Sequence, residues 1–173
     1  MKTLILFRHA KSDWSADYGV DHERPLNARG ERAAARMGKY LAAVDEVPPL
    51  ILTSTAVRAR TTVELAAEAG GWTSEIRRAR EFYGATPGSV IAVLREQADA
   101  VESILIAGHE PTWSELLGEL VSGGEFRFPT AAMARVTLEV DRWMEVTSGC
   151  GVLAWHVTPK LLGRAGIADE SQD

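Results

Sequence analysis

The stretch Thr3-Leu4-Ile5-Leu6-Phe7, followed at once by Arg8-His9, decides how the rest of the chain is interpreted. Its unbroken apolar run is typical of a strand buried on both faces of a sheet. Two further runs have the same character, Leu50-Ile51-Leu52 and Ser103 to Ala107. Segments of helical character lie between the three runs, and this order predicts a parallel sheet with helices packed on it.

The helical segments are marked by their end signals. Gly70-Gly71 ends a helix that begins near Ala56, and Thr86-Pro87 supplies an N-cap followed by a first-turn proline. The predicted helices cover residues 28–44, 56–69, 86–97 and 111–120. Residues 133–140 and 151–157 alternate as exposed or edge strands do.

This pattern predicts an α/β fold. We expect a three-layer α/β/α sandwich with a mostly parallel central sheet and antiparallel late strands. A single domain over residues 1–165 would hold this fold, and residues 166–173 would form a polar tail.

The composition argues against several functional classes. The 173 residues have a formal net charge of -5 and a pI of about 5.4, so an extended basic face for nucleic acid is not expected. One cysteine, Cys150, cannot form an internal disulfide, as is usual in a reducing compartment. No apolar stretch has the length of a membrane span or of a signal peptide's core, so we expect a cytoplasmic protein with no membrane partner.

Titratable residues follow the predicted strands where each strand ends. Arg8-His9 follows the first strand and Gly108-His109 follows the third, while Arg58 lies in the first turn of the helix after the second. The carboxyl ends of parallel strands meet at one edge of a sheet, and ligands bind there. Gly108 would allow a tight turn or a close approach to a ligand. The convergence of these residues predicts an anion-binding catalytic site.

Other groups of residues have simpler interpretations. Asp21-His22-Glu23 could bind a metal, but neighbours in sequence rarely point at one ion, so a solvated loop is the better interpretation. His156 is interpreted as a packed or exposed strand residue. Cys150 lacks the Arg-bearing phosphate loop of cysteine phosphatases. A single histidine after a strand is usually a loop residue, so the hypothesis depends on three strand ends converging.

Four blocks, in the same order along the chain, resemble the histidine phosphatase superfamily. They are the Arg-His-Gly/Ala signature at Arg8-His9-Ala10, Asp21 to Gly30, Thr53 to Thr62, and Gly108 to Pro111. The short length, the Arg-Pro-Leu segment and the late strand Thr130 to Val136 resemble the SixA-type phosphohistidine phosphatases. The resemblance covers roughly residues 1–160.

The resemblance implies a role for each of six residues. His9 would be the nucleophile, Arg8, Arg58 and His109 would bind phosphate, Arg24 would line the pocket mouth, and the Ser12 hydroxyl would contact phosphate. Nearby arginines would lower the pKa of His9 and keep it a free base at neutral pH. They would also supply the positive charge, so no metal or other cofactor is expected.

One departure from the family concerns the general acid. The mutase-like branch takes its acid from Glu-x-x-Tyr/Phe-Gly, and here Tyr83-Gly84 would require a glutamate where Arg80 stands. Glu81 is offset by one residue, which in a strand turns it to the other face, although a loop could bring it inward as a possible acid.

A weak acid favours a good leaving group, and therefore a phosphohistidine over an alkyl ester. We expect a phosphatase acting on a phosphorylated protein. The alternatives are a small-molecule phosphomonoesterase of the same superfamily and a phosphate-binding module without turnover. The sequence predicts no oligomeric state.

Overall fold

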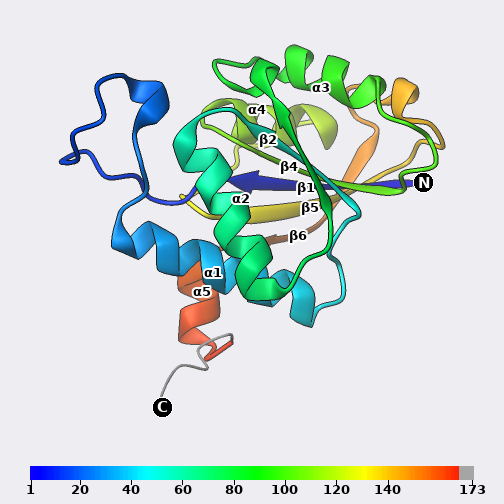
Figure 1. Cartoon of the computed structure of the whole chain (residues 1–173). Helices are drawn as coiled ribbons and strands as arrows, with labels where there is room; N and C mark the ends of the chain where they lie inside the picture. The colour runs from blue at the N-terminus through cyan, green and yellow to red at the C-terminus, as the bar shows by residue number, and fades with distance from the viewer. Residues whose placement is uncertain (168–173) are drawn as a thin grey trace.

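Within residues 1–167, which the computed structural model describes, the central sheet has six strands in the order β3-β2-β4-β1-β5-β6 (Figure 1). The strands are β1 (Lys2–Arg8), β2 (Leu50–Ser54), β3 (Glu75–Ala79), β4 (Ser103–Gly108), β5 (Met133–Leu138) and β6 (Gly151–Val157). The first four run parallel, and β5 and β6 join as antiparallel strands. The predicted mostly parallel sheet with antiparallel late strands is confirmed.

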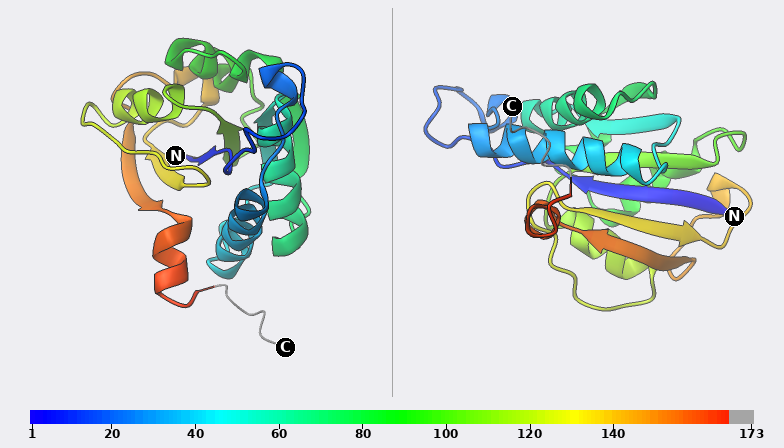
Figure 2. Two further views of the ribbon diagram at one scale, coloured as in Figure 1. Left: turned by 90° about the vertical axis from the view of Figure 1, so that its left-hand side faces the viewer. Right: turned by 90° about the horizontal axis from the view of Figure 1, so that it is seen from below.

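Helices cover both faces of this sheet (Figures 1 and 2). One face packs against α1 (Ala28–Ala43), α2 (Val57–Gly70) and α5 (Pro159–Arg164), and the other against α3 (Pro87–Arg95) and α4 (Thr112–Leu120). Three 3-10 turns complete the described elements: η1 (Asp21–Glu23), η2 (Arg80–Phe82) and η3 (Trp143–Glu145). The arrangement is the predicted three-layer sandwich.

The first strand shows why its sequence is continuously apolar. Leu4 and Leu6 lie in the core beneath α3 and α4, whereas Ile5 and Phe7 lie in the core beneath α1 and α2. All four side chains are fully buried. Successive residues of a strand point to opposite faces, so a strand covered on both sides needs apolar residues at every position.

Two elements differ from the prediction. The sequence analysis placed no strand between α2 and α3, yet Glu75–Ala79 forms β3 at the edge of the sheet, paired with β2. Four of its five residues are exposed, so backbone pairing rather than an apolar pattern defines it. The short helix α5 was also not predicted. Its N-cap Thr158 accepts from the N–H of Leu161 and is followed by Pro159, the same signal as Thr86-Pro87.

Smaller differences concern boundaries. The strand predicted for residues 133–140 ends at Leu138, and the helix predicted for residues 86–97 ends at Arg95. Of the predicted tail, residues 166 and 167 follow α5, and residues 168–173 lie outside the described residues. No helix of residues 1–167 has the length and apolar character needed to cross a membrane. The division into one domain and a tail stays a prediction.

Candidate active site

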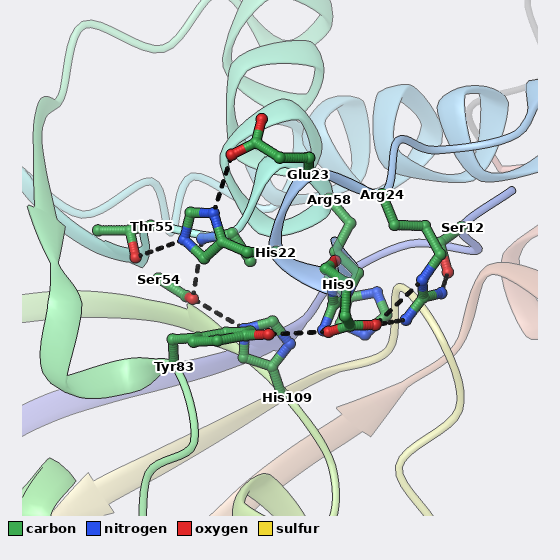
Figure 3. Close-up of polar contacts among 12 residues, drawn as sticks. His9, Ser12, His22, Glu23, Arg24, Ser54, Thr55, Arg58, Tyr83 and His109 are labelled. Carbon is green, nitrogen blue, oxygen red and sulfur yellow. Dashed lines mark hydrogen bonds and ion pairs between the residues drawn. The ribbon is translucent and has the colours of Figure 1, made fainter. Parts of the chain in front are cut away.

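Several elements deliver side chains to the carboxyl edge of the sheet. Arg8 and His9 come at the end of β1, His109 at the end of β4, and Arg58 from the first turn of α2. Figure 3 shows His9, Arg58 and His109. Arg8 and Gly108 are paired in register, so the two histidines follow neighbouring strands at the same level. Their ring centroids are 5.2 Å apart. The four residues predicted to carry the chemistry therefore lie together.

They line a pocket of about 370 Å³. Its walls are formed by Arg8, His9, Lys11, Ser12, Trp14, Arg24, Arg58, His109, Glu110 and Thr130. Three arginines and a lysine face a single carboxylate, which favours an anion with more than one negative charge. Ser12 and Arg24 lie in this wall, whereas Glu81 does not.

His9 is held by its surroundings in one orientation. It is 8% exposed, and its Nδ1 lies 2.7 Å from the carbonyl oxygen of Ala10. Nδ1 must be the protonated nitrogen to donate to that carbonyl, which leaves the lone pair on Nε2. Burial lowers the pKa of His9 to about 3, and the charges of His109, Arg58 and Arg8 act in the same direction, against the Ala10 hydrogen bond. The ring is therefore neutral near pH 7.

His109 has a different anchor. Its Nε2 lies 2.8 Å from the hydroxyl oxygen of Ser54, at the end of β2. Burial, followed by the charge of Arg58, lowers the pKa of His109 to about 4. The contact between Ser54 and His109 depends on β2 and β4 being neighbours in the sheet.

Gly108 has a packing role that the sequence did not predict. A Cβ at this position would lie 2.3 Å from a ring carbon of Trp113, which is fully buried. The glycine therefore makes room for the tryptophan of α4 beneath the site.

Arg8 and Arg24 both make contacts with uncharged groups. Arg8 donates from Nη1 to the carbonyl oxygen of Phe128 at 2.8 Å. Arg24 donates from Nη1 to the hydroxyl of Ser12, and its guanidinium lies over the ring of Trp14, 3.6 Å from the centroid. Such stacking leaves the edges of the guanidinium to hydrogen-bond with oxygen atoms, here those of Ser12 and Asp21.

Asp21 is a site residue that the sequence analysis missed. Its carboxylate accepts from Arg24 at 2.9 Å, from Arg58 at 3.1 Å and from the hydroxyl of Tyr83 at 2.9 Å. Burial raises the pKa of Asp21, but the hydrogen bonds from Arg24 and Tyr83 and the charge of Arg58 outweigh it and lower the pKa to about 2. The carboxylate is therefore an internal anion beside the pocket.

The segment Asp21-His22-Glu23 was weighed only as a metal site or a solvated loop. It forms η1, and within residues 1–167 no three His, Cys, Asp or Glu side chains form a group able to hold a metal ion. His22 instead lies 3.0 Å from the hydroxyl of Thr55, through its Nε2. The signal that could have identified Asp21 is its spacing of three residues from Arg24, which places both on one side of a turn.

Residues 80–83 place tyrosine, not glutamate, near the site. Arg80 and Glu81 are exposed in η2, and the next residues turn so that the Tyr83 ring lies 5.8 Å from that of His109. The carboxylate that lines the pocket belongs to Glu110. It accepts hydrogen bonds from the N–H and the hydroxyl of Ser114 at 2.9 and 2.6 Å.

Three buried nitrogens of the wall have no hydrogen-bond partner within the described residues: Arg8 Nε, Arg58 Nε and His109 Nδ1. Buried polar atoms in folded proteins are usually satisfied, and exceptions often mark a place where a ligand or water binds. Their grouping in a cationic pocket is the arrangement expected of an oxyanion site.

The comparisons with known proteins agree with this geometry. Residues 4–128 match the Histidine phosphatase superfamily (branch 1). An uncharacterised protein of Mycobacterium tuberculosis is 37% identical over 163 residues, which cover 88% of this chain and 99% of the relative. An uncharacterised chloroplastic protein of Arabidopsis thaliana is 28% identical over 165 residues, covering 90% of this chain and 75% of the relative.

Solved structures give the same result. The protein histidine phosphatase SixA in complex with tungstate has a TM-score of 0.80 and 26% identity, over 92% of this chain and 99% of that chain. A protein assigned as the phosphohistidine phosphatase SixA from Nakamurella multipartitia has a TM-score of 0.80 and 25% identity, over 91% and 96%. The chain therefore belongs to the histidine phosphatase superfamily, in its SixA-type branch.

Proposed function

We propose that this protein is a phosphatase in which His9 attacks phosphorus and carries the phosphoryl group transiently. One observation carries the proposal: the Nδ1 of His9 donates to the Ala10 carbonyl at 2.7 Å, so Nε2 keeps its lone pair in a pocket lined by three arginines. A pKa of about 3 keeps the ring a base at neutral pH. Nucleophilic attack on a phosphoryl group needs a neutral, oriented imidazole of this kind.

The reaction has two displacements. The Nε2 lone pair of His9 forms a P–N bond while the bond from phosphorus to the leaving group breaks, and the leaving atom keeps that electron pair. Water then attacks phosphorus, the P–N bond breaks, Nε2 regains its lone pair, and phosphate leaves as the water gives up a proton to the solvent. Arg8, Arg24, Arg58 and His109 bind the phosphoryl oxygens and stabilise their charge. Because side chains supply this charge, we propose a metal-independent reaction.

Within residues 1–167, the two carboxylates at the pocket are poorly suited to donate a proton, and this favours one substrate class. Glu110 accepts two hydrogen bonds from Ser114, and the low pKa of Asp21 keeps that carboxylate ionised. An alkoxide that leaves without a general acid loses roughly 100- to 10,000-fold in rate. Imidazole is a better leaving group. We therefore infer a protein phosphohistidine as substrate, as the names of the similar SixA proteins also indicate.

A trapping experiment tests this mechanism. The wild type and His9→Ala are mixed with a radiolabelled phosphohistidine protein in single-turnover amounts and quenched in denaturant. We expect acid-labile, base-stable label on His9 of the wild type and none on the variant. Label on Ser12, or turnover without any labelled enzyme, would contradict covalent catalysis by His9.

Rates on three substrate types then separate the alternatives. We expect phosphohistidine and aryl phosphates to be hydrolysed much faster than alkyl phosphates, with or without chelator. Equal or faster alkyl turnover would favour the small-molecule phosphomonoesterase. Phosphate binding with no turnover of any substrate would favour the non-catalytic module, and loss of activity in chelator would contradict metal independence.

A further inference from the structure

A second hollow, of about 210 Å³, adjoins the phosphoryl pocket. The two share Lys11 and Thr130 in their walls, so they lie side by side. The remaining wall of the second hollow includes Arg29 in the first turn of α1, Pro129, and Lys160 in the first turn of α5.

Regular elements fix the shape of this hollow. The N-terminus of α1 lies directly on the segment at Lys11, because a Cβ at Gly30 would be 2.1 Å from the Lys11 carbonyl oxygen. The Asn27 N–H donates to that same oxygen at 3.0 Å. The start of α5 is tied to α1 by Arg36, which donates to the Pro159 carbonyl at 3.3 Å, and the two helices lie near each other in Figure 2.

The charge of the hollow is one-sided. Lys11, Arg29 and Lys160 are exposed, and within residues 1–167 their charged groups have neither a hydrogen bond nor an ion pair. Among residues 1–167, no acidic residue lines the hollow. Another hollow that adjoins the phosphoryl pocket, around Tyr83, is lined by Glu110 and Glu115. The whole chain has a net charge of -5, so three unpaired cations beside the site stand out.

We propose that this hollow binds an acidic side chain of the phosphorylated protein substrate, close in sequence to the phosphorylated residue. The proposal rests on the proposed function, because it assumes that the phosphoryl group enters the neighbouring pocket. Lys11, Arg29 and Lys160 attract the carboxylate, and the ring carbons of Pro129 and Pro159 contact the aliphatic part of the peptide. The hollow thus selects which phosphorylated proteins are substrates, and the pocket performs the chemistry.

The test uses pairs of phosphohistidine peptides that differ only in Glu or Lys within three residues of the phosphohistidine. Three enzymes are compared: the wild type, R29E/K160E, and the control R32E/K39E. The control replaces two exposed cations of α1 that do not line the hollow, so the change in net charge is the same. Glu is compatible with a first helical turn, so the first variant should fold.

We expect the wild type to prefer the Glu peptide by about tenfold in kcat/KM, as surface charge pairs allow. R29E/K160E loses this preference, R32E/K39E keeps it, and all three hydrolyse p-nitrophenyl phosphate at similar rates. The preference should also weaken at high salt. A preference that survives in R29E/K160E, or that falls equally in the control, overturns the proposal.

A second peptide series separates this proposal from the proposed function. Phosphohistidine peptides could fail to be hydrolysed while phosphotyrosine peptides show the same Glu preference. That result would support the subsite for an acidic side chain and contradict the phosphohistidine substrate. If no peptide pair shows a preference while pyrophosphate inhibits the wild type more strongly than R29E/K160E, the hollow binds a second phosphate of a small molecule. That result overturns the acidic side chain as ligand.

Discussion

The two parts of the phosphoryl pocket are held by different forces. We define the floor as His9 and His109, which follow β1 and β4. The floor is fixed mainly by the backbone: the His9 N–H donates to the Gly108 carbonyl at 3.0 Å, and the His9 carbonyl accepts from Ala131 at 3.1 Å. These bonds continue the pairing of the sheet and do not depend on any side-chain charge.

We define the roof as Asp21 to Arg24, the segment of η1 and its C-cap. The roof is held by charge, because the Asp21 carboxylate joins Arg24 and Arg58 at 2.9 and 3.1 Å. A bound phosphoryl group would need the same guanidiniums. The floor can therefore stay fixed during catalysis, whereas the roof must share or exchange partners each time a phosphate binds.

The largest expected effect concerns the floor. His9→Ala removes the nucleophile, and we expect kcat/KM to fall by at least about 10,000-fold, as in enzymes whose nucleophile acts as part of a unit. Because the roof is untouched, the variant should still bind tungstate and unfold cooperatively. Activity of more than a few per cent, measured on phosphohistidine, would show that His9 is not the nucleophile.

The next effect is the pH dependence of the free energy of unfolding. It separates the floor from the roof because their titratable groups act in different pH ranges. The pKa values of His9 and His109 are about 3 and 4 in the folded chain, against 6.5 for the free side chain. Below pH 6.5 the unfolded chain therefore binds protons that the folded chain does not, so stability falls as the pH falls. At about 1.4 kcal/mol per pH unit, the loss by pH 5 is about 2 kcal/mol for each ring.

Asp21 has linkage of the same sign in a lower pH window. Its lowered pKa contributes stability above its ordinary value of 3.8, which is lost only below that pH. Urea unfolding at pH 7 and pH 5 therefore reports the buried histidines and not Asp21. Burial also lowers the pKa of His156, which contributes equally in the wild type and in His9→Ala. His9→Ala should lose about 2 kcal/mol less than the wild type between these pH values. Equal losses in both proteins would contradict a buried neutral His9.

A smaller effect distinguishes two roles of Asp21 in the roof. Asp21→Asn removes the charge that competes with phosphate but keeps an oxygen for the arginines, so inorganic phosphate should bind about three- to tenfold more tightly. Asp21→Ala also removes the side-chain oxygen that holds Arg24 and Arg58 in position. The arginines should then bind phosphate less tightly than in Asp21→Asn. The inhibition constants of inorganic phosphate, measured for the wild type, Asp21→Asn and Asp21→Ala, give the comparison. If Asp21→Asn binds phosphate more weakly than the wild type does, Asp21 acts mainly by positioning the arginines and not by competing with phosphate for them.

The floor could be predicted from the sequence because buried strands are the clearest pattern in it. Leu4 to Phe7 and Ile104 to Ala107 identify neighbouring strands, and the residues that follow them must meet at one edge. Arg58 could be placed for the same reason, since a helix begins where β2 ends.

The roof could not be predicted in this way. The path of residues 13–20 decides whether Asp21 faces solvent or the arginines, and no periodic pattern encodes that path. β3 was missed because its charged residues are exposed at an edge, where backbone pairing alone defines a strand. The family resemblance identified Arg24 but gave no role to Asp21.

The smallest expected effect concerns Glu81, which the sequence analysis weighed as a possible acid. Glu81 is exposed in η2 and lies outside the wall of the pocket, whereas Tyr83, two residues later, donates its hydroxyl to Asp21 at 2.9 Å. An exposed residue without a partner at the site changes a free energy by roughly 0.5 kcal/mol or less, so Glu81→Gln should alter kcat/KM by no more than about twofold on phosphohistidine and on alkyl phosphates. The matched variant Tyr83→Phe removes only one hydroxyl, yet it loosens the hydrogen bond that steadies the Asp21 carboxylate and should have the larger effect. Steady-state rates of both variants on both substrates give the comparison. A loss of 100-fold or more in Glu81→Gln, about the low end for a missing general acid, would place Glu81 in the reaction and require η2 to rearrange when substrate binds.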